Sequence, residues 1–202
     1  MNAFDRLKLW RLKRLPRTER SVQGTHLGVA QSVVLLYKHD SPEKTQRMQE
    51  WARKFKAAGG PALQITPLAY WVRSKEEREA DKKPASENDA KASPSPFSDL
   101  PQPWLFFNET AVSSWRKPKS VELRRLINTD YDLLIFCETS PCWVLEEILA
   151  RSKAKMKMGP SGLVRSKDLD IILASRDTPT VEAHLQATLD FLTNAPLQSP
   201  QP

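Results

Sequence analysis

The chain has 202 residues, of which 31 are lysine or arginine and 24 are aspartate or glutamate, giving a formal net charge of +7. This length suits one well-buried domain rather than two. No run approaches the roughly 18 apolar residues of a membrane span, and the start lacks the apolar core of a secretory signal. We therefore expect a cytoplasmic protein, for which membrane binding is disfavoured.

Residues 1–20 contain seven basic and two acidic side chains, so they carry +5 of the net charge of +7. Helical propensity predicts a helix over residues 4–15, but apolar and basic positions share one arc of the helical wheel, unlike the segregated faces of a membrane-surface helix. The helix is either a basic arm for a polyanion such as RNA, or it packs Phe4, Leu7 and Trp10 on the domain while its charges stay solvated. The basic residues of this arm are Arg6, Lys8, Arg11, Lys13, Arg14, Arg17 and Arg20.

The rest of the chain alternates apolar runs with amphipathic segments, which is typical of α/β proteins. Strands are predicted at 32–37, 62–72, 104–107, 133–136, 155–158 and 169–174. The second of these contains Pro67, so it either bends there or lies at a sheet edge. Residues 73–103 hold many prolines, charges and small side chains with little to bury, which predicts a disordered insertion.

The clearest unit runs from 131 to 159. The continuous apolar run at 133–136 indicates a strand covered on both faces, as in a parallel sheet. Ser140 and Pro141 suit the N-cap and first position of a helix. In that helix Val144, Leu145, Ile148 and Leu149 make one apolar stripe, and Glu146, Glu147 and Arg151 are predicted to face outward.

One type of strand-to-helix junction occurs three times, as LLYKHDSP at 35–42, LIFCETSP at 134–141 and ILASRDTP at 172–179. Right-handed crossovers place such junctions at the carboxyl edge of a parallel sheet, where open α/β sheets bind ligands. An enzyme or small-ligand binder could use His39, Asp40, Glu138 and Asp177 there, with Asp40 or Glu138 as general base. Alternatively, these polar side chains only satisfy the ends of helices.

A second group of basic residues lies at 151–167, a stretch without any acid. These cations can engage phosphates through charge alone, or they can protect an edge strand from pairing with other chains. The group consists of Arg151, Lys153, Lys155, Lys157, Arg165 and Lys167.

Motifs for cofactors and metals do not occur in the sequence. No G-x-G-x-x-G or G-x-x-x-x-G-K-[ST] loop follows a strand. The two cysteines, Cys137 and Cys142, have no histidine nearby and are too few for a structural zinc site. His184 lies on the last predicted helix and is interpreted as structural. We therefore expect neither a cofactor nor a metal ion.

The segments YDLLIFCETSPCWVLEEILARSKAKMKMG at 131–159 and FNETAVSSWRKPKS at 107–120 resemble an uncharacterised family of short bacterial Rossmann-like α/β proteins. That resemblance implies a fold and no activity or catalytic residue. The first segment is also similar to a unit in the N-terminal half of heptosyltransferase-like glycosyltransferases, which implies at most an acceptor-like cleft.

These observations predict a three-layer, Rossmann-like α/β domain with a mainly parallel sheet of five or six strands. We expect residues 1–31 to be a basic helix and its connection, 32–194 the domain with an insertion at 73–103, and 195–202 a frayed tail. The leading hypothesis for function is a non-enzymatic module that docks on RNA, a ribonucleoprotein or an acidic protein.

Overall fold

One six-stranded, wholly parallel sheet forms the centre of the protein. The computed structural model describes residues 3–73, 104–115, 117–174 and 180–194. The strand order is β3-β2-β1-β4-β5-β6, so the direction in which strands are added reverses between β1 and β4. The predicted α/β fold with five or six strands is confirmed. The strands are β1 Ser32–His39, β2 Gln64–Trp71, β3 Leu105–Phe107, β4 Leu133–Phe136, β5 Met156–Pro160 and β6 Ile171–Leu173.

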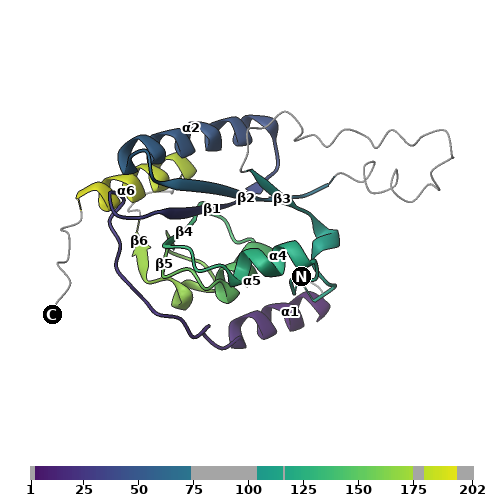
Figure 1. Cartoon of the computed structure of the whole chain (residues 1–202). Coiled ribbons are helices and arrows are strands. Elements are labelled where there is room, and N and C mark those ends of the chain that lie inside the picture. The colour runs from purple at the N-terminus through teal and green to yellow at the C-terminus, as the bar shows by residue number, and fades with distance from the viewer. Residues whose placement is uncertain (1–2, 74–103, 116, 175–179, 195–202) are drawn as a thin grey trace.

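Helices cover both faces of the sheet. Figure 1 shows α2 (Pro42–Gly59) and α6 (Val181–Asn194) on one face and α4 (Val121–Asn128) and α5 (Trp143–Arg151) on the other. The first helix, α1 (Ala3–Arg14), lies outside α5 and adds a partial fourth layer. Two short 3-10 helices, η1 (Glu109–Ala111) and η2 (Ser166–Asp168), follow β3 and β5.

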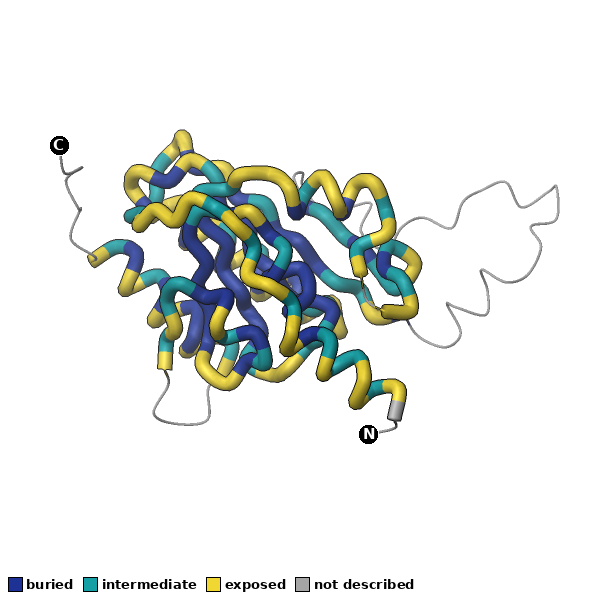
Figure 2. Tube along the Cα trace, turned by 90° about the horizontal axis from the view of Figure 1, so that it is seen from below, coloured by how far each residue is buried: buried dark blue, intermediate teal, exposed yellow. Residues whose placement is uncertain are grey.

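The strands bury side chains on both faces, as their continuous apolar runs predict. In β1, Leu35 and Tyr37 pack on the side of α2 and α6, whereas Val34 and Leu36 pack on the side of α4 and α5. The burial colouring of Figure 2 shows the sheet as the darkest part of the chain. The domain therefore has one core on each side of the sheet.

The predicted helix start at 42 is confirmed. Ser41 accepts a hydrogen bond from the Lys44 amide at 3.2 Å, and Pro42 occupies the first turn, where its missing N–H costs nothing. The helix ends at Gly59, and Gly60 follows with a φ of 85°, a conformation that glycine adopts without strain.

Other local predictions need correction. The helix expected from Pro141 begins at Trp143, with Cys142 as its N-cap. Strand β5 lies between β4 and β6, so the basic residues near it do not protect a sheet edge. Pro67 lies within an interior strand, but β3 pairs with β2 only from Leu68 onward. Beside Pro67 the β3 side of β2 therefore has no strand neighbour among the described residues.

Two sequence predictions cannot be compared with the structure. Most of the insertion expected at 73–103 and all of the tail at 195–202 lie outside the described residues. Among the helices that the structure does describe, none combines the length and apolar character needed to cross a membrane.

Candidate functional site

The N-terminal arm, residues 3–20, docks on the domain through charged contacts rather than through an apolar face. Arg11 donates to both carboxylate oxygens of Glu147 on α5, at 3.1 and 2.6 Å, and to the carbonyl oxygen of Trp115 at 2.6 Å. Leu12 is the buried apolar residue of α1, with 2 % exposure. These contacts join segments more than a hundred residues apart in the chain.

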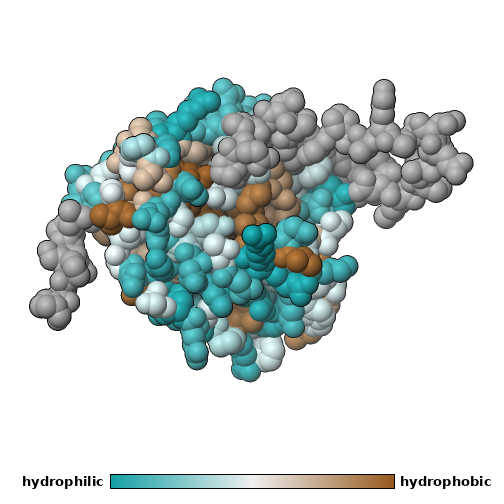
Figure 3. All heavy atoms as spheres, in the orientation of Figure 1, coloured by the Kyte–Doolittle hydropathy of each residue, from teal (hydrophilic) through white to brown (hydrophobic). Residues whose placement is uncertain are grey.

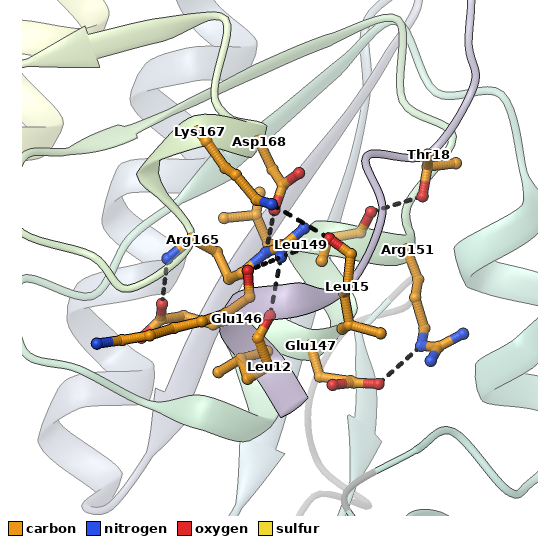
Figure 4. A network of polar contacts seen from close by, with 12 residues as sticks. Leu12, Leu15, Thr18, Glu146, Glu147, Leu149, Arg151, Arg165, Lys167 and Asp168 are labelled. Carbon is orange, nitrogen blue, oxygen red and sulfur yellow. Dashed lines mark hydrogen bonds and ion pairs between the residues drawn. The ribbon is translucent and has the colours of Figure 1, made fainter. Parts of the chain in front are cut away.

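Arg165 holds the end of α1 from inside the domain. Its guanidinium is fully buried, pairs with Asp168, and donates to the carbonyl oxygens of Leu12 at 2.8 Å and Leu15 at 2.9 Å. Figure 4 shows it between η2 and the last turn of α1, with Lys167 reaching Leu15 beside it. A helix end leaves its last carbonyls without intrahelical donors, and a cation there also complements the helix dipole. Arg165 therefore acts as a buried cap for α1.

The chain after α1 is also held on the domain by ion pairs and hydrogen bonds. Arg17 and Arg20 both pair with Asp170, at 2.8 and 2.5 Å. Arg20 also donates to the carbonyl oxygens of Ala154 and Lys155, and the Thr18 hydroxyl donates to that of Ala150. Much of the basic charge in this part of the arm is thus neutralised within the protein.

Two carboxylates of α5 are buried rather than exposed. Glu146 and Glu147, predicted to face solvent, are both fully buried. Glu147 lies between Arg11 and Arg151, and Glu146 accepts the amide of Arg165 at 2.8 Å. Burial raises the pKa of Glu146, an effect that this amide partly offsets. The outward placement of these two carboxylates was wrong because Arg11 of α1 pairs with Glu147, and the amides of Val164 and Arg165 donate to Glu146.

The opposite side of α1 remains accessible. We call it the outer face of α1 and define it by Phe4, Arg6, Leu7, Trp10, Lys13 and Arg14. Phe4, Leu7 and Trp10 are 46 %, 46 % and 51 % exposed, so about half of each side chain remains accessible to solvent. The lower part of the surface in Figure 3, where Figure 1 places α1, is mostly hydrophilic with hydrophobic residues interspersed.

Aromatic and cationic side chains alternate on this helix. Arg14 lies 4.3 Å above the ring of Trp10, and Lys8 lies 4.0 Å above that of Phe4. Phe4 also meets Trp115, another exposed aromatic residue, edge to face at 5.5 Å. Within the described part of the chain, Arg6, Lys13 and Arg14 form no ion pair. The outer face of α1 therefore combines unpaired cations with exposed aromatic rings and contains no acid.

The second basic group does not form one surface. Lys157 and Arg165 are buried, so neither lies on the surface where we expected it. Lys157 donates to the carbonyl oxygen of Leu149 at 2.8 Å, and burial lowers its pKa to about 7. Lys155 pairs with Asp132. Lys153 remains exposed, and no contact links its side chain to another described residue.

The sequence contained a sign of this internal pairing. The acid-free stretch is followed directly by Asp168 and Asp170, which pair with Arg165, Arg17 and Arg20. The pairing of Arg17 and Arg20 with Asp170 was missed because 153 and 150 residues separate these partners in the sequence, and only the tertiary structure brings them together.

The carboxyl edge of the sheet forms a second polar cluster at the point where strand order reverses. Glu138, which follows β4, is 3 % exposed and accepts the amide of Lys38 at 2.8 Å. Its carboxylate also pairs with Lys44 at 2.7 Å, and Lys44 reaches Asp40 at 3.6 Å. Sequence reasoning missed Lys44, which lies in the first turn of α2 just after the junction. The cluster links β1, α2 and β4.

Three of the four residues predicted as catalytic at this edge, His39, Asp40 and Glu138, lie in the described part of the chain. His39 Nδ1 contacts the Thr45 hydroxyl at 2.5 Å, while Asp40 and Glu138 share the lysines. Asp177 lies outside the described residues. A cavity of about 210 Å³ opens beside Asp40 and Lys44, between α2 and α6. Ion pairs at this edge therefore link β1, α2 and β4, and a small polar cavity lies beside them.

Histidine and cysteine side chains elsewhere have structural environments. His184 is buried and its Nε2 contacts the carbonyl oxygen of Phe136 at 2.9 Å, and burial lowers its pKa. Both cysteines are free thiols, and burial raises the pKa of each. No cluster of three potential metal-ligating side chains was found among the described residues.

A family model described as a family of unknown function (DUF6913) matches residues 100–192. This region extends from before β3 into α6 and includes the β4-α5-β5 unit, but not α1, β1, α2 or β2. No curated protein and no solved structure matches the chain.

Proposed function

We propose that the protein is a non-enzymatic binding module that docks on RNA, free or within a ribonucleoprotein, through the outer face of α1. The observation that carries the proposal is the set of unpaired cations Arg6, Lys13 and Arg14 beside the exposed Trp10. An RNA-binding role of this kind is consistent with the cytoplasmic location that we expect.

The chemistry of this face suits a polyanion with exposed bases. Cations that approach phosphates release counterions, which gives binding a steep dependence on salt. Exposed aromatic rings provide stacking platforms for unpaired bases, and arginine planes add cation–π contacts. A phosphate-only surface needs no rings, so Trp10 favours single-stranded RNA over duplex.

The internal ion pairs support the proposal indirectly. Because Arg11 and Arg165 fix α1 on the domain, the outer face keeps one orientation and loses little entropy on binding. The remaining cations project from a positioned helix rather than from a mobile tail.

A salt titration tests the proposal. Binding of a fluorescently labelled single-stranded RNA, followed by anisotropy, is expected to weaken with salt. If Arg6, Lys13 and Arg14 each contact one phosphate, the slope of log affinity against log salt is about −2. The double variant Lys13→Gln/Arg14→Gln should reduce this slope to about −0.7 and weaken binding at least about tenfold.

The chain offers a matched control on the opposite side of the sheet. Arg53 and Lys54 are adjacent, exposed and on α2, so Arg53→Gln/Lys54→Gln makes the same change in charge. The proposal is refuted if both double variants weaken RNA binding equally, or if the wild type binds anionic vesicles but not RNA. Trp10→Ala separates stacking from charge, because it should weaken binding without changing the salt slope.

A second candidate is a small-ligand binder or enzyme at the carboxyl edge, favoured by the cavity of about 210 Å³ beside Asp40 and Lys44. The similarity of residues 131–159 to a unit of heptosyltransferase-like glycosyltransferases implies at most an acceptor-like cleft. The cavity is smaller than the roughly 300–1,000 Å³ of drug-sized sites, which limits it to a small ion or fragment. Calorimetric titration with inorganic phosphate tests it, and absence of heat at millimolar phosphate rejects that ligand.

A further inference from the structure

A cleft on the α2 side of the sheet was not anticipated from the sequence. It has a volume of about 530 Å³, within the usual range for sites that hold drug-sized molecules. Its walls come from α2, from the start of β2 and from the residue before β3. The lining residues are Gln49, Ala52, Arg53, Lys56, Leu63, Gln64, Ile65, Pro67 and Trp104.

The cleft exists because β3 is short. Pairing between β2 and β3 begins at Leu68, so the earlier half of β2 is paired with β1 but has no strand on its other side among the described residues. The amide of Gln64 donates toward β1, to Gln31 at 2.8 Å, and alternation directs the backbone of Ile65 and Pro67 to the open side. Pro67 removes one donor there, which discourages a further strand from pairing at this edge.

The floor of the cleft is apolar and rigid. Leu63, Ile65 and Trp104 are 0 %, 8 % and 8 % exposed. The Trp104 ring lies edge to face with Tyr37 at 6.3 Å and stacks with Phe106 at 6.4 Å. A preformed apolar floor of this kind can bind a hydrocarbon or ring body with little reorganisation.

The rim is cationic on one side only. Gln49, Arg53 and Lys56 are spaced four and three residues apart, so they follow one face of α2. The Lys56 ammonium donates hydrogen bonds to the carbonyl oxygens of Pro61 and Leu63. Arg53 is exposed, and no hydrogen bond or ion pair joins it to another described residue. Among the described residues that line the cleft, none is acidic.

We propose that this cleft binds an amphipathic small molecule with an apolar body and one carboxylate, the body resting on Trp104, Ile65 and Ala52 and the carboxylate facing Arg53. The planar guanidinium matches a carboxylate with two parallel hydrogen bonds. Gln49, one turn away, supplies a neutral polar contact. The site lies on the opposite face of the sheet from α1 and is independent of the proposed RNA interface.

Dodecanoate is the test ligand, and isothermal titration calorimetry of the full chain is the measurement. We expect saturable binding at one site, with Arg53→Gln weakening it about tenfold. Lys54→Gln is the matched control, because Lys54 is the neighbouring cation of α2, lies 4.1 Å above the Trp51 ring and does not line the cleft. It should leave affinity within about twofold of wild type.

A second pair of variants tests the position of the apolar body. Ala52→Trp fills the cleft and should abolish binding, whereas Ala57→Trp makes the same change at an exposed position of α2 outside the lining. Circular dichroism checks that Ala52→Trp remains folded, and the exposed Arg53→Gln provides a test that does not depend on it. The proposal is overturned if dodecanoate shows no saturable binding, if dodecyltrimethylammonium binds equally well, or if Arg53→Gln and Lys54→Gln have the same effect.

Discussion

Replacement of Arg165 by methionine tests whether buried charge holds α1 on the domain. The variant removes donors to Leu12 at 2.8 Å and Leu15 at 2.9 Å and leaves the fully buried Asp168 without its cation. Removing one partner of a buried ion pair costs about 3–5 kcal/mol. Against a typical unfolding free energy of about 5–15 kcal/mol, this is a large loss.

Urea denaturation followed by circular dichroism measures the loss. Lys167→Met is the control, since Lys167 is exposed and makes one hydrogen bond to the same carbonyl of Leu15 at 3.2 Å. It should change stability by less than about 1 kcal/mol. The double variant Arg165→Met/Asp168→Asn should recover part of the loss, because it also removes the unpaired charge.

Limited trypsin digestion locates the effect in the structure. If Arg165 caps α1, Arg165→Met should accelerate cleavage at Arg14, Arg17 and Arg20 relative to cleavage at other sites, because these bonds become accessible when the arm detaches. A loss below about 1 kcal/mol, together with an unchanged cleavage pattern, would show that the buried guanidinium does not hold the arm.

Three further variants examine the interior. Burial lowers the pKa of Lys157 to about 7, below the roughly 10.4 of an unfolded lysine, so the free energy of unfolding should rise between these pH values by up to about 1.4 kcal/mol per pH unit. Lys157→Met should flatten this pH dependence, measured by urea denaturation. An unchanged slope would contradict the lowered pKa of Lys157. Gly159→Ala places a Cβ 3.1 Å from Phe136 Cβ and should cost about 1–3 kcal/mol, visible as a lower thermal midpoint. Glu138→Gln removes the ion pair with Lys44 and should lower the free energy of unfolding by about 1–3 kcal/mol, measured by urea denaturation. An unaltered urea midpoint would indicate that the carboxylate does not stabilise the fold.

Local sequence patterns predicted the elements that depend on neighbouring residues. The apolar run at 133–136 identified β4, and Ser41 with Pro42 identified the start of α2, because strand burial and helix capping act over a few residues. The start of α5 was placed two residues early. Ser140 and Pro141 satisfy the same preferences, but the chain uses Cys142 as the N-cap.

The candidate site was less predictable because charge pairing acts through space. Counting cations along the sequence gave one basic arm and one basic group. The structure brings Arg17 and Arg20 to Asp170 and Arg11 to Glu147, pairs separated by more than 130 residues. A sequence pattern cannot show which cations are neutralised at that range.

The sequence by itself determined a parallel α/β sheet with helices on both faces, since continuous apolar strands between amphipathic helices have few other stable arrangements. Only the tertiary structure decided which face of α1 is accessible. A helical wheel assumes that one side of a helix packs and the other faces solvent. In this fold α5 packs on the sheet, and its other side meets α1 at Glu147 and the segment at 164–165 at Glu146. The same packing leaves Trp10, Lys13 and Arg14 facing outward.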